Sequence, residues 1–140
     1  MSFGDSVRYC LNNYANFNGR ASRPQFWWFW LFTFIVSAIP SIIGQIFIVA
    51  GRPPTPFDDG IVLFSIIGWL LYIVGVIISL AFIVPLLAAG SRRLHDRGLS
   101  GWLQLLLLLS FCFGIGFIIL AIFWALPGTP GPNQYGESAA

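Results

Sequence analysis

Three long apolar runs constrain the fold of this chain more than any other feature. They occupy residues 25–50, 61–90 and 102–126, and almost all charged residues lie outside them. Crossing a hydrocarbon core of about 30 Å takes roughly 20 helical residues, and each run reaches that length. Because backbone groups in lipid need internal hydrogen-bond partners, such runs form helices. The sequence therefore predicts an all-α, polytopic membrane protein with three transmembrane helices.

Composition argues against a soluble protein. The chain is 57% hydrophobic and 9% charged, whereas soluble domains carry roughly 25% charged residues. Three helices that are apolar on every face cannot be covered by the rest of 140 residues. The net charge of +2 is small and forms no basic stripe, so we expect no nucleic-acid partner. The 24 mostly polar residues before the first run do not resemble a cleavable signal peptide.

The distribution of arginine predicts the orientation, because cytoplasmic segments carry the excess of basic residues. The head (residues 1–24) and the second connection are rich in arginine, the first connection has one, and the tail (residues 127–140) has none. In chain order the arginines are Arg8, Arg20, Arg23, Arg52, Arg92, Arg93 and Arg97. We therefore expect the head and the second connection in the cytoplasm, and the first connection and the tail outside.

The third run allows two interpretations. Gly114 and Gly116 lie near its centre, and each glycine costs a helix about 1 kcal/mol relative to alanine. Glycine is nevertheless common in membrane helices, so one continuous span is the expectation. The alternative is a hairpin of two half-helices, which would return the tail to the inner side. Charge does not decide between them, because the tail has no basic residue.

The head has a helical pattern of its own. Phe3, Val7, Cys10 and Leu11 recur at helical spacing, continued by Tyr14 and Phe17, with polar residues between them. This pattern predicts a short amphipathic helix lying in the membrane interface. An ordered cytoplasmic arm packed on the helical bundle explains the same pattern.

Two arginine-rich segments flank the predicted spans. In the first, Ser22 and Pro24 suit the start of a helix, which puts Arg20 and Arg23 at the depth of lipid phosphates. They either anchor the first span or help to form a site for lipid headgroups. In the second, Asp96 lies three and four residues from two arginines, Arg93 and Arg92, and can pair with either.

The second segment also contains turn signals and the single histidine. Gly98 is expected to end the second helix and Ser100 to cap the third. His95 is a poor metal ligand, since no further His, Cys or acidic cluster has ligand spacing. We expect it to make structural hydrogen bonds, with a pH switch as the alternative. No nucleophile motif accompanies the His95-Asp96 pair, so no catalytic residue, cofactor or metal is predicted.

The order of three motifs resembles a known family. They are Y-x-x-F-x-G-R-A-S-R-x-x-F-W (residues 14–27), R-R-L-H-D-x-G-x-S-G-W (92–102) and P-G-T-x-G-x-N-x-Y-G (127–136). Together they resemble the domain-of-unknown-function 805 family, the YhaH-like bacterial inner-membrane proteins. The resemblance implies a small multi-pass protein of the bacterial inner membrane with no assigned activity. With the arginine pattern, it puts the N-terminus in the cytoplasm and the C-terminus in the periplasm.

The functional prediction is a non-catalytic membrane module rather than an enzyme. It would bind anionic lipid headgroups or a membrane protein partner, including a second copy of itself, through its cytoplasmic arginine-rich segments. The candidate binding residues are Arg20, Arg23, Arg92, Arg93, His95, Asp96 and Arg97. The alternative is a channel or transport component, such as a homo-oligomeric pore. The absence of ionisable residues inside the apolar runs argues against a pump.

Overall fold

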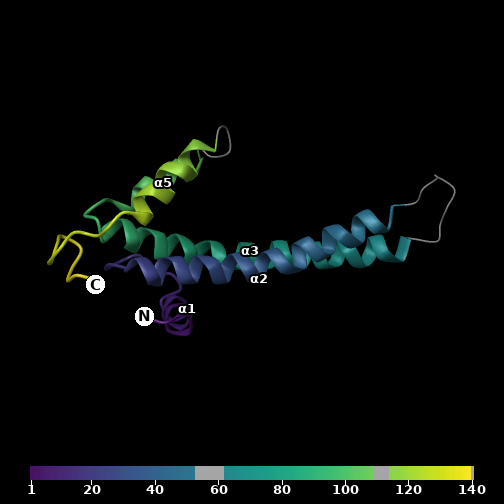
Figure 1. The fold of residues 1–140 in the computed structure, drawn as a ribbon, viewed down its shortest axis with the longest axis horizontal. Helices are drawn as coiled ribbons and strands as arrows, with labels where there is room; N and C mark the ends of the chain where they lie inside the picture. The colour runs from purple at the N-terminus through teal and green to yellow at the C-terminus, as the bar shows by residue number, and fades with distance from the viewer. Residues whose placement is uncertain (53–61, 109–113, 140) are drawn as a thin grey trace. The chain divides into compact units, whose positions relative to one another are not determined.

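A computed structural model describes residues 1–52, 62–108 and 114–139. Its helices are α1 (Phe3–Asn12), α2 (Arg23–Ala50), α3 (Val62–His95), the 3₁₀ helix η1 (Gly101–Leu105) and α5 (Ile115–Ala125) (Figure 1). The described residues contain no strand beyond one isolated bridge between Asn133 and Gly136. The chain divides into two compact units, Met1–Trp30 with Val84–Ala140, and Leu31–Ile83. Most of the first connection and Cys112 lie outside the described residues.

Helices α2 and α3 form from the first two apolar runs, and each is long and apolar enough to cross a membrane. In the most apolar part of each helix, only 11% of the residues are buried within the protein. The core helix of a soluble protein would be mostly buried instead. The exposed side chains along both helices are large and apolar, which suits contact with lipid.

Within the unit Leu31–Ile83, α2 and α3 pack side by side through glycine (Figure 1). A Cβ atom on Gly44 would lie 2.6 Å from the backbone nitrogen of Tyr72, and one on Gly68 would lie 2.6 Å from that of Ile48. Small residues of this kind let the backbones of membrane helices approach closely. Near the end of α2, Ser65 Oγ donates a hydrogen bond of 2.8 Å to the carbonyl of Gly51.

The predicted end of the second helix is confirmed. Gly98 has a φ of +73°, the left-handed conformation that glycine favours. The N–H of Leu99 donates to the carbonyl of Leu94 at 3.0 Å, and that of Gly98 donates to His95 at 2.9 Å. These two bonds form a Schellman motif, which ends a helix. Ser100 then caps η1, since its Oγ accepts from the N–H of Trp102 at 3.3 Å.

The third run does not form one continuous helix. It contains η1, a short helical stretch at residues 106–108 and the separate helix α5, which Gly114 precedes with a φ of +68°. One helix from Trp102 to Leu126 would be about 36 Å long. The chain instead contacts the last two turns of α3 at both ends of the run. Gly101, just before the run, packs against Ser91, and the carbonyl of Leu126, its last residue, accepts from Arg93. The continuous-span expectation is therefore wrong, and the opposite-side position of the tail no longer follows from it.

The head contains a helix, α1, that ends at Asn12, before Tyr14 and Phe17. Ser2 and Asp5 form a capping box at its start, where Ser2 Oγ accepts from the N–H of Asp5 at 3.2 Å. Cys10 is fully buried, next to Arg92 of α3. The other apolar side chains of α1, such as Phe3, are partly exposed. These contacts favour a packed arm, and insertion into the interface stays a prediction.

Candidate functional site: a polar corner

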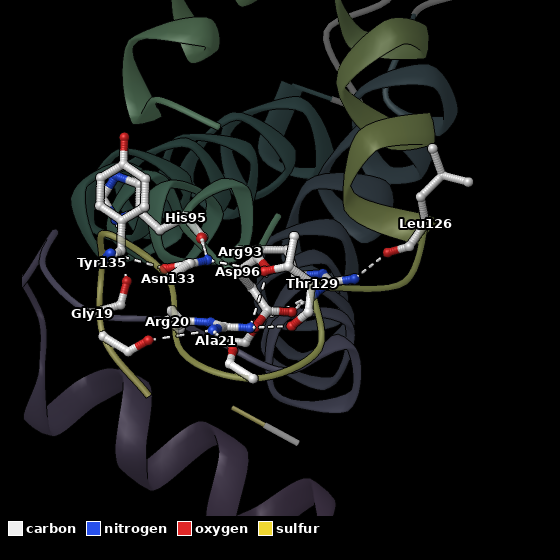
Figure 2. Close-up of polar contacts among 12 residues, drawn as sticks. Gly19, Arg20, Ala21, Arg93, His95, Asp96, Leu126, Thr129, Asn133 and Tyr135 are labelled. Carbon is white, nitrogen blue, oxygen red and sulfur yellow. Dashed lines mark hydrogen bonds and ion pairs between the residues drawn. The ribbon is translucent and has the colours of Figure 1, made fainter. Parts of the chain in front are cut away.

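Three segments far apart in sequence meet at the C-terminal end of α3 (Figure 2). They are residues 19–21 of the head, residues 91–97 at and just after the end of α3, and residues 127–136 of the tail; we call them together the polar corner. Gly19 adopts a φ of +87°, which allows the chain to turn before α2. The next segment is fixed to α3, since the N–H of Ala21 donates to the carbonyl of Arg92 at 3.0 Å.

Asp96 lies at the centre of the polar corner, and its side chain is buried between two arginines. Its Oδ1 accepts from Arg20 Nε at 2.9 Å, and its Oδ2 accepts from Arg93 Nη1. The predicted pairing with Arg93 is confirmed, whereas Arg92 does not pair with it among the described contacts. The bond from Arg20 spans 76 residues. No local pattern in the sequence indicated it.

The guanidinium of Arg20 is fully engaged by protein oxygens. Besides Asp96 Oδ1, it donates to the carbonyls of Thr129 at 2.7 Å, Gly131 at 2.6 Å, Gly136 at 3.3 Å and Asp96 at 3.3 Å. A guanidinium has five N–H donors, so each has an acceptor. Arg20 therefore attaches the tail to the end of α3, and it has no donor left for a ligand in this conformation.

Arg93 connects the same carboxylate to the end of α5. Its Nε donates to the Trp124 carbonyl at 2.9 Å, and its Nη2 donates to the Leu126 carbonyl. Its Nη1 contacts Asp96 and, at 3.5 Å, the carbonyl of Ala21. The last carbonyls of a helix have no partner within the helix. Arg93 supplies partners for them, and a cation suits the negative end of the helix dipole.

The tail forms no helix in its described part and is held to the end of α3 by hydrogen bonds. Thr129 donates to the Asp96 carbonyl through its N–H at 2.9 Å and through Oγ1 at 3.0 Å. Asn133 Nδ2 donates to the His95 carbonyl at 2.9 Å. Gly128 packs directly against the Asp96 carboxylate, where a Cβ atom would collide with it. These tail residues belong to the third sequence motif, but no local sequence signal indicated that they contact the end of α3.

His95 has a structural environment within the polar corner. Its ring stacks on Tyr135, with centroids 3.9 Å apart and planes 4° from parallel. Its Nδ1 lies 3.2 Å from the carbonyl of Gly19, which requires Nδ1 to carry the proton and donate it. The imidazole therefore joins the head to the tail, in agreement with the expected structural hydrogen bond.

The other three predicted residues lie outside this network. Arg92 is buried with 1% of its surface exposed, and its guanidinium lies 5.3 Å from the Tyr9 ring centroid. Arg97 is half-buried, 5.7 Å from the ring centroid of Phe123, and Arg23 is exposed. The structure thus brings Arg20, Arg93, His95 and Asp96 together in one closed cluster and leaves three arginines around it.

The closed cluster is suited to holding segments together. Asp96 is flanked by two guanidinium groups, and each of its carboxylate oxygens accepts a hydrogen bond from one of them. No group of three or more His, Cys, Asp or Glu residues that could hold a metal occurs in the described ranges. The cluster consists instead of hydrogen bonds that fix the head and the tail to α3.

The fold and this corner define an all-helical membrane protein with two long apolar helices and a polar cluster at one helix end. A family model described as "Protein of unknown function (DUF805)" matches residues 14–137. The chain belongs to this family.

Two relatives from Escherichia coli (strain K12) support the assignment. Inner membrane protein YhaI is 35% identical over 127 residues, which cover 91% of this chain and 88% of the relative. Inner membrane protein YhaH is 35% identical over 130 residues, which cover 90% and 88%. No solved structure matches the chain. The match extends over all three segments of the polar corner.

Proposed function

We propose that this protein is a non-catalytic module of the bacterial inner membrane that binds anionic lipid headgroups beside its polar corner. The observation that carries the proposal is an imbalance of charge. Five arginines lie in or around the corner, and among the described residues both ion pairs go to the single carboxylate of Asp96. An anionic partner would offset the remaining positive charge.

The contacts within the corner divide the arginines into two roles. Arg20 and Arg93 are buried, and they use their donors on protein oxygens. Arg23 is exposed, and Arg97 is half-exposed with its Nη1 buried and without a hydrogen-bond partner among the described residues, so both keep donors for a phosphate. A guanidinium can bind a phosphate through two parallel hydrogen bonds. Trp28 and Trp102, 41% and 78% exposed, lie in the same unit and suit the headgroup region.

The topology that fits this proposal places the head, the polar corner and the tail at the cytoplasmic surface. The arginine distribution supports that side, and the bonds between head, α3 and tail support a common surface. In this arrangement α2 and α3 cross the membrane, and the third run enters and returns. The names of the relatives support the inner membrane as the location.

Lipids retained by the purified protein test the proposal. We expect phosphatidylglycerol or cardiolipin to co-purify in mild detergent, and native mass spectrometry would count the bound molecules. The Arg23→Gln/Arg97→Gln variant should retain less of these lipids. Arg52→Gln is the control, because Arg52 is exposed and lies in the first connection, away from the corner in the sequence. Equal retention by all three proteins would refute the proposal.

A flux assay separates the proposal from the alternative of a pore. Liposomes that contain the purified protein alone should show no ion flux above that of empty liposomes. Flux that depends on the protein would favour the channel interpretation instead.

A further inference from the structure

Arg92 makes fewer and longer hydrogen bonds than the other two buried arginines, Arg20 and Arg93. Its exposed fraction is 1%, yet its Nε makes a long bond of 3.3 Å to the Ala88 carbonyl, and its Nη2 reaches only the thiol of Cys10, at 3.8 Å. Its Nη1 is buried without a hydrogen-bond partner among the described residues. Arg20 and Arg93, in contrast, donate to oxygens through Nε, Nη1 and Nη2.

Arg92 also has no acidic partner within the described part of the chain. Both ion pairs there belong to Asp96, which binds the other two arginines. A buried charge is costly unless it is paired and hydrogen-bonded. The ring of Tyr9, 5.3 Å away, offsets only part of this cost, because a cation–π contact supplies no acceptor for the N–H groups. The surroundings of Arg92 therefore favour an anion.

A second donor without a partner lies beside the same thiol. Gln25 is 5% exposed, and its Nε2 is buried without a hydrogen-bond partner in the described ranges. Its side chain is close enough to Cys10 to influence the thiol, as Arg92 does. Gln25 also lies one helical turn after Ala21, whose N–H bonds to the Arg92 carbonyl. Two donors without a partner among the described residues, one of them charged, thus belong to side chains next to the same thiol.

We propose that Arg92 Nη1 and Gln25 Nε2 form an anion site, covered by Cys10 and Tyr9 of α1, that binds a phosphate group. This inference rests on the proposed function, and it adds that Arg92 and Gln25 are the buried residues that contact the phosphate. A phosphate oxygen accepts from both donors at once and brings the negative charge that Arg92 lacks. The group comes from an anionic phospholipid, or from free phosphate, and an experiment can separate these sources.

The reactivity of Cys10 reports on the site, because this thiol lies next to the side chains of both Arg92 and Gln25. A Cys112→Ser background leaves Cys10 as the single cysteine. Its alkylation by a maleimide would be timed in nanodiscs of phosphatidylcholine with and without phosphatidylglycerol. We expect slower alkylation with phosphatidylglycerol. Protection by inorganic phosphate in detergent, without lipid, would assign the site to free phosphate.

Gln25→Leu tests the site without changing the net charge. It removes the second donor, and we expect the concentration of phosphatidylglycerol needed for half protection to rise about tenfold, as for one lost hydrogen bond to a charged group. Gln45→Leu is the matched control, since Gln45 lies in the same helix but is exposed. It should behave as the parent does. Arg92→Lys keeps the charge but loses the forked geometry, and it should also weaken protection.

The failure of this inference can be told apart from the failure of the proposed function. If Gln25→Leu and the parent show the same protection, the two donors do not form the site, even if the protein retains anionic lipid. If neither phosphatidylglycerol nor phosphate changes the alkylation rate, the buried donors bind no anion. If anionic lipid is not retained by the parent at all, the proposed function itself is wrong.

Discussion

Replacing Asp96 by Asn should destabilise the protein far more than its place beside a helix end suggests. Asparagine has nearly the same shape, but its amide supplies only one acceptor oxygen and no charge. If that oxygen keeps the bond from Arg20, the NH₂ group faces Arg93 Nη1, and two donors oppose each other. Two guanidinium groups that are almost fully buried then share no carboxylate.

The size of the effect follows from burial. Exposed ion pairs on a helix are worth about 0.3–0.5 kcal/mol. Removing one partner of a buried pair costs about 3–5 kcal/mol, because a charge is left buried and uncompensated. The side chains of Arg20 and Asp96 are 1% and 7% exposed, so the larger value applies.

Thermal unfolding in detergent, followed by tryptophan fluorescence, would measure the change. Asp5→Asn is the control, since Asp5 is an exposed carboxylate in the capping box of α1. Its effect should be much smaller than that of Asp96→Asn. A loss of stability below about 1 kcal/mol for Asp96→Asn, the scale of a surface pair, would refute the buried network.

Three further predictions concern the tail, the two chain ends and the thiol of Cys10. Gly128→Ala should release the tail, because the added Cβ atom would collide with the Asp96 carboxylate, and limited proteolysis should then cut the tail faster. Gly4→Ala is the control, because a Cβ atom at Gly4 has open space around it. Cysteines placed at Ser2 and Ser138 should react with an impermeant reagent from the same side of the membrane, and opposite sides would contradict the packed tail. Burial raises the pKa of the Cys10 thiol, so the native protein should react with maleimide more slowly than the denatured protein at neutral pH, and equal rates would contradict its burial.

Local sequence signals predicted much of the fold correctly. The length of the apolar runs gave α2 and α3, because the bilayer thickness fixes the number of helical residues. Gly98 and Ser100 marked a helix end and a helix start, since glycine allows positive φ and serine accepts from a free N–H. The spacing of three and four residues left Arg93 and Arg92 as partners for Asp96, and the structure pairs Asp96 with Arg93.

The parts that sequence did not predict depend on contacts between distant segments. Arg20 and Asp96 are 76 residues apart, and Arg20 and Gly131 are 111 apart. No periodicity in the sequence connects residues so far apart. The sequence therefore indicated that Arg20 is available to lipid, whereas its N–H groups donate to protein oxygens. The prediction of one continuous span in the third run was wrong for a related reason. Apolar composition gives the length of a buried segment but not its direction, and only Gly114 and Gly116 marked the place of a turn. In the structure it is Gly114 that adopts the left-handed conformation before α5.

The break in the third run and the burial of Arg93 are connected. Helix α5 has 11 residues, so it is about 16 Å long and cannot cross a hydrocarbon core of about 30 Å. A helix that ends near lipid leaves carbonyls without partners, which is costly where water is scarce. Arg93 supplies donors to the carbonyls of Trp124 and Leu126, and Asp96 balances its charge. Arg92 differs from Arg93, because its guanidinium donates to no terminal carbonyl of another helix and pairs with no acid in the described residues. Arg93 thus stabilises the end of α5, whereas Arg92 keeps a buried N–H group that could donate to the proposed anion.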